Sequence, residues 1–228
     1  MATHYDIVRR DIVDSTQDVA SERFAETGVP VLVLAGRQVG GRGRQGRTWV
    51  EPDRAMYSSL AFESDWDPAR LPVLSLCVGV AVRRALRSLG VTVDLKWPND
   101  LLIGDAKVGG ILVEASGQTV TAGCGVNLVW DRPVELAGAL FDVLPDDDFA
   151  ASLAVRWADE FVAIATAPPD AWPVDEYRAA CVTLGAAVSW DGGEGLATDI
   201  TDDGALVVDT PDGRTEITQG DVHLHRRG

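Results

Sequence analysis

Residues 91–129 read VTVDLKWPNDLLIGDAKVGGILVEASGQTVTAGCGVNLV and hold the pattern that decides the fold. Short apolar runs in this stretch predict β-strands at 91–96, 101–103, 107–115 and 120–126. Gly104-Asp105 and Gly117-Gln118 separate the last three runs and predict the tight turns of β-hairpins. The stretch therefore predicts an antiparallel-rich sheet.

Helices and further strands surround this central stretch. Ser15 offers an N-cap side chain with an acid three residues later, and Gly28 supplies a stop, so we expect a helix that runs to Thr27. Other runs predict helices at 67–89, 147–166 and 174–181 and strands at 30–35 and 56–63. Residues 36–53 form a long loop rich in glycine and arginine, and loops of this length in compact domains are usually functional.

The chain changes character after Gly185. Short strand-like runs follow at 187–190, 196–200, 205–208, 214–218 and 222–224, with glycine-containing turns between most of them. This spacing predicts a small β-barrel. We therefore expect an α+β fold in two domains, with a mixed, antiparallel-rich sheet in residues 1–183 and the barrel in residues 184–228.

The composition limits the classes of function. The chain has 228 residues with 20 basic and 35 acidic side chains, and its net charge of −15 opposes broad binding to DNA or to an anionic membrane. The three cysteines lie far apart and match neither a disulfide framework nor a Cys-rich zinc site. The sequence shows no signal peptide and no membrane-spanning run, so we expect a cytoplasmic protein.

Lysine is nearly absent from the chain. Lys96 and Lys107 are the two lysines, and the other 18 basic residues are arginines. A genome that disfavours lysine codons explains the general bias. Under that bias a lysine should persist where a compact ammonium does what a planar guanidinium cannot, so both residues are candidates for a functional site.

The segment 41–49, GRGRQGRTW, is the first candidate binding site. It fits the pattern G-x-G-x-x-G, but Pro52 opposes the helix that a dinucleotide-binding fold requires after that pattern. Its glycines expose backbone N–H groups, and its arginines gather positive charge in an acidic chain. We expect a loop that binds phosphates or carboxylates and stays mobile until an anion orders it; the alternative is a solvated loop.

Further motifs bring polar groups to strand ends. KWPND at 96–100 joins a lysine, an aromatic ring and oxygen ligands that suit Mg²⁺, although Pro-Asn-Asp is also an ordinary turn. KVGG at 107–110 and GCGVN at 123–127 place glycines in strands, which indicates a close approach by another group or a β-bulge. The histidines lie near the chain ends and are expected at the surface.

Taken in order, and together with Ser15-Thr16 and Gln38, these motifs resemble the biotin protein ligase family over nearly the whole chain. The resemblance implies a catalytic domain of the class II synthetase and lipoate ligase type, followed by a Src-homology-like barrel. It implies a ligase that joins biotin and ATP into biotinyl-5′-AMP with Mg²⁺ and transfers biotin to a lysine of a biotin carboxyl carrier domain of a carboxylase. Because the Ser-Thr motif begins at residue 15, we expect a monofunctional type without an N-terminal DNA-binding domain; a homodimer stays open.

The resemblance also implies roles for individual residues. The biotin site would consist of Ser15, Thr16, Gln17, Gln38, Arg42, Gly43, Arg44, Lys107, Gly109, Gly110 and Gly125. The ATP site would consist of Arg44, Arg47, Trp49 and Asn127, and the metal ligands would be Asp100 and Asn127. The family usually has Asn where this chain has Gln17, so that position departs from the family pattern.

The residue types agree with this chemistry. A carboxylate that attacks a phosphate meets like-charge repulsion, so positioning and charge neutralisation by Lys107 and Arg44 would carry most of the catalysis. Asp100 is the candidate that accepts the proton of the acceptor lysine during transfer. Two alternatives stay open: a lipoate-type ligase of the same fold, and a biotin-binding or repressor-like protein without enzymatic activity, which need not keep Lys107.

Overall fold

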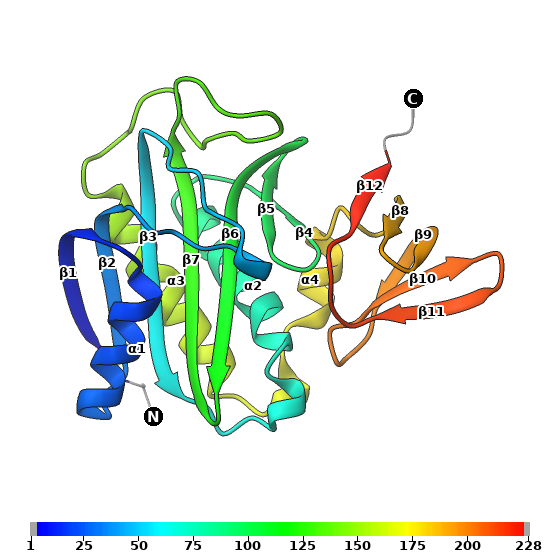
Figure 1. Cartoon of the computed structure of the whole chain (residues 1–228), viewed down its shortest axis with the longest axis horizontal. Helices are drawn as coiled ribbons and strands as arrows, with labels where there is room; N and C mark the ends of the chain where they lie inside the picture. Colours follow the sequence, from blue (N-terminus) through cyan, green and yellow to red (C-terminus); the bar gives the residue numbers. More distant parts are fainter. Residues whose placement is uncertain (1–3, 226–228) are drawn as a thin grey trace.

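The computed structural model describes residues 4–225 and contains two β-sheets side by side (Figure 1). The larger sheet has seven strands in the order β1-β2-β3-β7-β6-β5-β4. Their bounds are β1 Asp6–Val13, β2 Val31–Gln38, β3 Arg54–Glu63, β4 Asp94–Lys96, β5 Asp100–Ile103, β6 Ala106–Ser116 and β7 Thr119–Val129. β1 and β2 are parallel, and the other neighbouring strands are antiparallel. The predicted mixed, antiparallel-rich sheet is confirmed.

Helices cover both faces of the larger sheet (Figure 1). Their bounds are α1 Thr16–Thr27, α2 Val73–Ser88, α3 Phe149–Ala165 and α4 Val174–Ala180, with short 3-10 turns at Arg44–Gly46, Pro68–Arg70 and Pro169–Ala171. α2 and α3 pack on one face and enclose the main apolar core around the buried Trp157 and Phe161. α1 packs on the other face through Ala20 and Phe24. None of the helices within residues 4–225 is long and apolar enough to span a membrane.

The smaller sheet has five antiparallel strands in the order β11-β10-β9-β8-β12. Their bounds are β8 Ala187–Trp190, β9 Gly193–Ile200, β10 Leu206–Thr210, β11 Gly213–Ile217 and β12 His223–His225. The predicted strands and the fold class are confirmed. In the described part of the chain no strand pair joins β11 to β12, so the hydrogen-bonded sheet is open. Residues 226–228 of the expected second domain lie outside the described residues.

Side-chain contacts join the smaller sheet to the β4 edge of the larger one. The indole nitrogens of Trp97 and Trp172 donate to the backbone oxygens of Gly204 and Asp202, at 3.0 and 2.7 Å. Arg178 of α4 also contacts the Asp199 carboxylate of β9 at 2.9 Å. These contacts place the smaller sheet next to the β4 edge of the larger sheet (Figure 1).

Some elements differ from the sequence prediction. β1 was not expected, because its apolar residues stand in two pairs and do not alternate with polar ones. Only Val13 of its eight residues is buried, and pairing with β2 forms the strand. α2 begins at Val73, because Pro68 starts a separate 3-10 turn and Pro72 occupies the cap position of the helix. The strand expected from residue 91 begins at Asp94.

Candidate functional site

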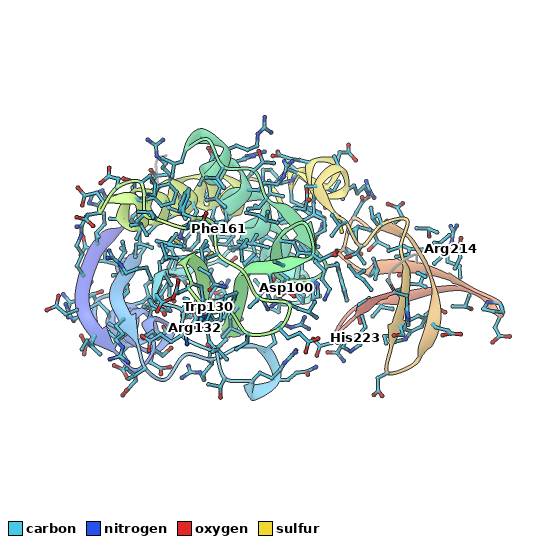
Figure 2. All side chains as sticks on the ribbon, turned by 90° about the horizontal axis from the view of Figure 1, so that it is seen from above. Asp100, Trp130, Arg132, Phe161, Arg214 and His223 are labelled. Carbon is cyan, nitrogen blue, oxygen red and sulfur yellow. The ribbon has the colours of Figure 1, made fainter. Side chains whose placement is uncertain are left out.

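A cavity of about 220 Å³ opens on the face of the larger sheet that carries α1. It is lined by the start of α1, the loop at 39–53, the strands β3, β6 and β7 with the 96–100 turn, and residues 221–223. In Figure 2, Asp100 lies in the larger part of the molecule and His223 lies on the smaller sheet. Motifs that are spread over the whole chain therefore converge on this cavity.

One end of the cavity is polar and uncharged. Gln38 Oε1 accepts hydrogen bonds from the backbone N–H of Thr16 at 2.8 Å and from its hydroxyl at 3.1 Å. The Thr16 hydroxyl also lies 2.8 Å from Ser59 Oγ on β3. Ser15 caps α1 by accepting from the backbone N–H of Gln17 at 3.2 Å, which fixes both hydroxyls at the start of the helix. Such a network suits a neutral ligand group that both donates and accepts hydrogen bonds.

Gln17 ties α1 to the sheet at this end of the cavity. Its Nε2 donates to the Glu114 carboxylate at 2.9 Å, and to the backbone oxygens of Leu112 and Thr121 at 3.4 and 3.3 Å. Gly123 leaves room for the amide, since a Cβ there would lie 2.7 Å from Gln17 Oε1. Gln17 therefore shapes the cavity wall while its amide nitrogen is engaged by the protein.

The other end of the cavity carries the two lysines and an acid. Lys107 Nζ lies 2.6 Å from Asp100 Oδ1, whereas Lys96 Nζ lies 3.9 Å from Asp100 Oδ2. Strand pairing explains the cluster, because β4 and β5 place Lys96 opposite Asp100 and the β5–β6 hairpin places Lys107 opposite Leu102. The Lys107 side chain is 40% exposed, so its ammonium stays accessible from the cavity.

Trp49 forms a wall between the two ends. Its ring lies so close to the sheet that a Cβ on Gly110 would be 2.8 Å from it, and a Cβ on Gly125 would be 3.1 Å from it. Lys107 Nζ lies 5.9 Å from the centre of the indole. The group whose close approach the strand glycines indicated is therefore an indole ring.

The loop at 39–53, called the arginine loop below, folds into a small hairpin at the cavity. Arg42 and Thr48 form an antiparallel bridge, and Gly43 N donates to Arg47 O at 2.6 Å. These backbone contacts give the loop a defined shape where the sequence pattern predicted an irregular segment.

Arg42 of the arginine loop is paired with an acid on α1. Its two terminal nitrogens donate to the Asp18 carboxylate at 2.5 and 2.8 Å. The hydrogen bond from Arg42 lowers the pKa of Asp18 below its ordinary value, and Asp18 in turn raises the pKa of the guanidinium. Glu114 Oε2 lies 4.0 Å from the same guanidinium. Arg42 is thus bound to the protein itself.

The other two loop arginines have different partners. Arg47 donates to both carboxylate oxygens of Asp221, at 2.7 and 2.6 Å, and so joins the loop to the segment before β12. Arg44 donates to the side-chain oxygen of Asn99 in the 96–100 turn at 3.4 Å. The loop therefore spans from α1 to the smaller sheet.

Asn127 lies beside the cavity, outside its lining. Its Nδ2 donates to the backbone oxygens of Gly138 and Lys107 at 2.8 and 3.4 Å, and its Oδ1 is buried without a hydrogen-bond partner. An unpartnered buried amide oxygen fits a cation ligand, whereas Asp100 Oδ1 is engaged by Lys107. Among residues 4–225 no three His, Cys, Asp or Glu side chains gather into a metal cluster.

The structure brings to the cavity some residues that the sequence did not single out. They are Tyr57, Ser58, Ser59, Asp221, Val222 and His223. A polar Ser-Ser pair inside the apolar run of β3 was a usable signal. Residues 221–223 offered none, because only the packing of the two sheets brings them to the cavity. Gly109 of the expected biotin site instead packs against Leu101 within the sheet, where a Cβ would lie 2.7 Å from that side chain.

The fold and the cavity together define an α+β protein with a ligand site to which both sheets contribute. Residues 10–129 match the Biotin/lipoate A/B protein ligase family, and residues 193–224 match the Biotin protein ligase C terminal domain. The first match covers more than half of the chain and includes α1, the arginine loop and the strands that line the cavity. The chain therefore belongs to the biotin/lipoate A/B protein ligase family.

Relatives and solved structures agree with this assignment. The biotin--[acetyl-CoA-carboxylase] ligase of Paracoccus denitrificans is 31% identical over 235 residues, which cover 92% of this chain and 96% of that protein. The bifunctional ligase/repressor BirA of Escherichia coli is 37% identical over 131 residues, but the match covers 54% of this chain and only 41% of that protein. The biotin protein ligase from Aquifex aeolicus in complex with biotin and ATP has a TM-score of 0.79 and 26% identity, over 98% of this chain and 100% of that one.

Proposed function

We propose that this chain is an ATP-dependent ligase that forms biotinyl-5′-AMP from biotin and ATP. In this proposal it then transfers biotin to a specific lysine of a biotin carboxyl carrier domain of a carboxylase. The observation that carries the proposal is a cavity with an uncharged polar end at Thr16 and Gln38 and a cationic end at Lys107. Biotin has matching groups, a neutral ureido ring and a carboxylate. The names of the Paracoccus and Aquifex relatives support the same substrates.

The proposed biotin site follows the two ends of the cavity. The ureido ring would lie against the hydroxyl and amide groups at the start of α1, and the carboxylate would point toward Lys107 and Arg44. We assign to this site Ser15, Thr16, Gln17, Gln38, Arg42, Gly43, Arg44, Lys107, Gly109, Gly110 and Gly125. Gly109 and Arg42 would act by shaping its walls, since their contacts are with the protein. Gln17 is engaged by the protein through its amide nitrogen, whereas its Oε1 is buried without a hydrogen-bond partner.

In the first step, a biotin carboxylate oxygen forms a bond to the α-phosphorus of ATP, and pyrophosphate leaves with the electron pair of the broken P–O bond. Two anionic groups must approach each other, so the main task of the protein is to neutralise charge and to hold geometry. Lys107 brings a compact ammonium to this point, and Asp100 holds that ammonium at 2.6 Å. Arg44 would add a second cation from the loop side.

The proposed ATP site lies between the arginine loop and the 96–100 turn. Trp49 would pack beside the adenine, and Arg44 and Asn127 would lie near the phosphates. Arg47 would contribute to the ATP site by holding the loop through Asp221. Mg²⁺, when bound, neutralises phosphate charge and usually takes few protein ligands. Asn127 Oδ1, which is buried without a partner, is the candidate protein oxygen, and Asp100 is the second.

In the second step, the amine of the acceptor lysine forms a bond to the acyl carbon, AMP leaves, and the amine gives up a proton. We assign Asp100 as the group that accepts this proton. Asp100 lies at the cationic end of the cavity. Its Oδ1 contacts Lys107 Nζ at 2.6 Å, whereas its Oδ2 lies 3.9 Å from Lys96 Nζ, so Oδ2 is the oxygen that we assign to accept the proton.

We place the carrier domain at the free edge of β6. β5 pairs with β6 only as far as Gly110, so residues 112–116 have a paired neighbour on one side, in β7. Ile111 N donates to Asn99 O at 2.9 Å on the β5 side, and alternate residues of a strand share a side. The N–H groups of Val113 and Ala115 therefore point to the free edge, where an extended strand of the carrier can pair.

We further propose that residues 1–183 and 184–228 are separate domains and that the protein acts in the cytoplasm, where ATP and carrier domains are available. DNA and membranes are not among the partners we propose, since the chain carries a net charge of −15.

Pyrophosphate exchange with the purified chain tests the proposal. Biotin should drive exchange between ATP and labelled pyrophosphate, and addition of a carrier domain should yield biotinylated carrier. Exchange with lipoate in place of biotin would assign the chain to the lipoate-type ligases of the same fold. Binding of biotin in isothermal titration without any exchange would indicate a binding protein without ligase activity.

A further inference from the structure

The arginine loop is attached to two other parts of the chain by its own cations. We propose that Asp18 and Asp221 are positioning residues, which hold the arginine loop at the cavity through Arg42 and Arg47 and leave Arg44 as the loop cation that meets the substrate. The attachment of the loop stands on geometry alone, whereas the role of Arg44 rests on the proposed function.

The first attachment lies at the start of the loop. Asp18 is in the first turn of α1, and its two oxygens receive the two nitrogens of Arg42 at 2.5 and 2.8 Å. Glu114 Oε2 lies 4.0 Å from the same guanidinium and is held in place by Gln17 Nε2 at 2.9 Å. Two acids beside one arginine leave no net positive charge there, so Arg42 offers little attraction to a substrate anion.

The second attachment lies at the other end of the hairpin. Arg47 and Asp221 are 174 residues apart in the chain, yet Arg47 Nη2 contacts both carboxylate oxygens at 2.7 and 2.6 Å. Asp221 also lines the cavity. A charge-assisted contact of this kind fixes both partners more firmly than a neutral hydrogen bond does. The loop is therefore held from α1 on one side and from the smaller sheet on the other.

Arg44 lies between these attachments and has a neutral partner. Its contact is with the side-chain oxygen of Asn99 at 3.4 Å, and within residues 4–225 no carboxylate forms an ion pair with it. Its charge is therefore available to a carboxylate or phosphate in the cavity. The sequence alone predicts a loop that an external anion orders; Asp18 and Asp221 supply two internal anions before any ligand arrives.

Proteolysis of the ligand-free protein tests the attachment directly. Trypsin cleaves after arginine, so the rate of cleavage after Arg42, Arg44 or Arg47 measures how often the loop opens. We expect Asp18→Asn and Asp221→Asn each to speed this cleavage about fivefold, and the double variant to be faster still. The matched control is Glu26→Gln, which removes an exposed ion pair with Arg23 on the same helix and should leave the rate unchanged. Unchanged cleavage in both Asp variants would overturn the proposal.

An exchange of the two charges tests whether faster cleavage comes from the lost ion pair or from a general loss of folding. Asp18→Arg combined with Arg42→Asp restores an ion pair at the same place and should return cleavage after Arg44 and Arg47 to the slow rate of the unmodified protein at these two sites. A combined variant that is cleaved in the loop as fast as Asp18→Asn would contradict the proposed attachment.

Kinetics of biotin-dependent pyrophosphate exchange distinguish positioning from chemistry. Asp18→Asn and Asp221→Asn should raise KM about fivefold and change kcat less than about twofold, because a smaller share of the protein has the loop closed. Arg44→Ala should instead lower kcat. Equal effects on kcat in all three variants would refute the division of roles. If the unmodified chain shows no exchange with biotin while the Asp variants still open the loop, the proposed function fails and the attachment stands.

Discussion

At the scale of single residues, Asp100 contacts two lysines at different distances. The ammonium of Lys107 lies 2.6 Å from Asp100, and that of Lys96 lies 3.9 Å from it. Asp100 therefore orients Lys107 more strongly than Lys96. A chain that uses arginine almost everywhere has both of its lysines beside Asp100, where a compact charge fits.

Substitution of Lys107 by arginine should remove most of the adenylation activity. A planar guanidinium cannot occupy the place of an ammonium held by one carboxylate, so we expect Lys107→Arg to lose about 100-fold in the rate of biotin-dependent pyrophosphate exchange. Lys96→Arg, the matched variant, should lose less than about tenfold. Near-normal exchange by Lys107→Arg, or equal losses in both variants, would show that the lysines are ranked wrongly.

Substitution of Asp100 by asparagine should separate the two chemical steps. If Asp100 accepts the proton of the acceptor amine, Asp100→Asn slows transfer from pre-formed biotinyl-5′-AMP more than it slows formation of the adenylate. Single-turnover assays of each step measure the two rates. Equal losses in both steps would assign Asp100 to the positioning of Lys107 and leave the proton acceptor to another group.

Some residues of the site could be predicted from the sequence, and others could not. The sequence predicts Thr16, Gln38 and Lys107 as site residues because each belongs to a recognisable motif. Asp221 belongs to no motif, and Asp18 belongs only to the helix-capping pattern that starts at Ser15. They lie 174 and 24 residues from the arginines that they bind. An ion pair between distant residues depends on how the elements pack, so local patterns cannot disclose it.

At the scale of elements, the glycines of β6 and β7 let Trp49 lie directly on the sheet. A Cβ at Gly110 would lie 2.8 Å from the indole, so Gly110→Ala must displace it. We expect a loss of about 1–3 kcal/mol in the free energy of unfolding and a weaker apparent affinity for ATP. Gly79→Ala on α2 is the control, because its Cβ would meet Leu95 at 3.5 Å, which is ordinary contact. Thermal unfolding and the KM for ATP test this, and equal behaviour of the two variants would contradict it.

The free edge of β6 should govern transfer but not adenylation. Proline at Ala115 removes an N–H that points to the free edge and leaves the ladder with β7 intact. Ala115→Pro should therefore slow biotinylation of the carrier about tenfold or more and leave exchange near normal, because strand pairing supplies much of such an interface. Ala115→Ser keeps the N–H and serves as the control. Normal transfer by Ala115→Pro would place the carrier elsewhere.

The ion pair between Asp18 of α1 and Arg42 of the arginine loop should stop stabilising the protein at acid pH. Arg42 lowers the pKa of Asp18, and Glu114 is the other charged group that faces this guanidinium. The contribution of the pair is therefore complete above the ordinary pKa of an aspartate, about 3.9, and is lost as the pH falls through the lower folded-state value. The difference in unfolding free energy between the unmodified protein and Asp18→Asn should be constant above about pH 5 and shrink toward pH 2. A difference that grows on acidification would have the wrong sign.

Elements with a local signal were predicted well. The Ser15 cap and Gly28 stop of α1 are confirmed, and Gly28 has a left-handed φ of 66°. The hairpins of β5, β6 and β7 follow from glycine turns between apolar runs. β1 was not predicted because it is an edge strand with six of its eight residues exposed, so pairing with β2 rather than its own pattern forms it.

At the scale of the whole molecule, the charge at the cavity is opposite in sign to the net charge of the chain. The chain carries −15 overall, yet arginines and lysines line the cavity. Acids at Asp18, Asp100 and Asp221 pair with four of these cations and so limit the local positive field. Sequence reasoning foresaw the cationic loop, but it could not place the smaller sheet, whose contribution to the cavity depends on packing between the two sheets.

The cavity is lined by residues from Ser15 to His223, nearly the full span of the described chain. During synthesis on a ribosome the first wall therefore emerges on the order of 10 to 40 s before the last, at usual rates of translation. A nascent chain that lacks residues 221–223 has no carboxylate to bind Arg47, so its arginine loop is held only by the ion pair with α1. Ligand capture should accordingly strengthen once residues 221–223 have emerged and packed beside the arginine loop.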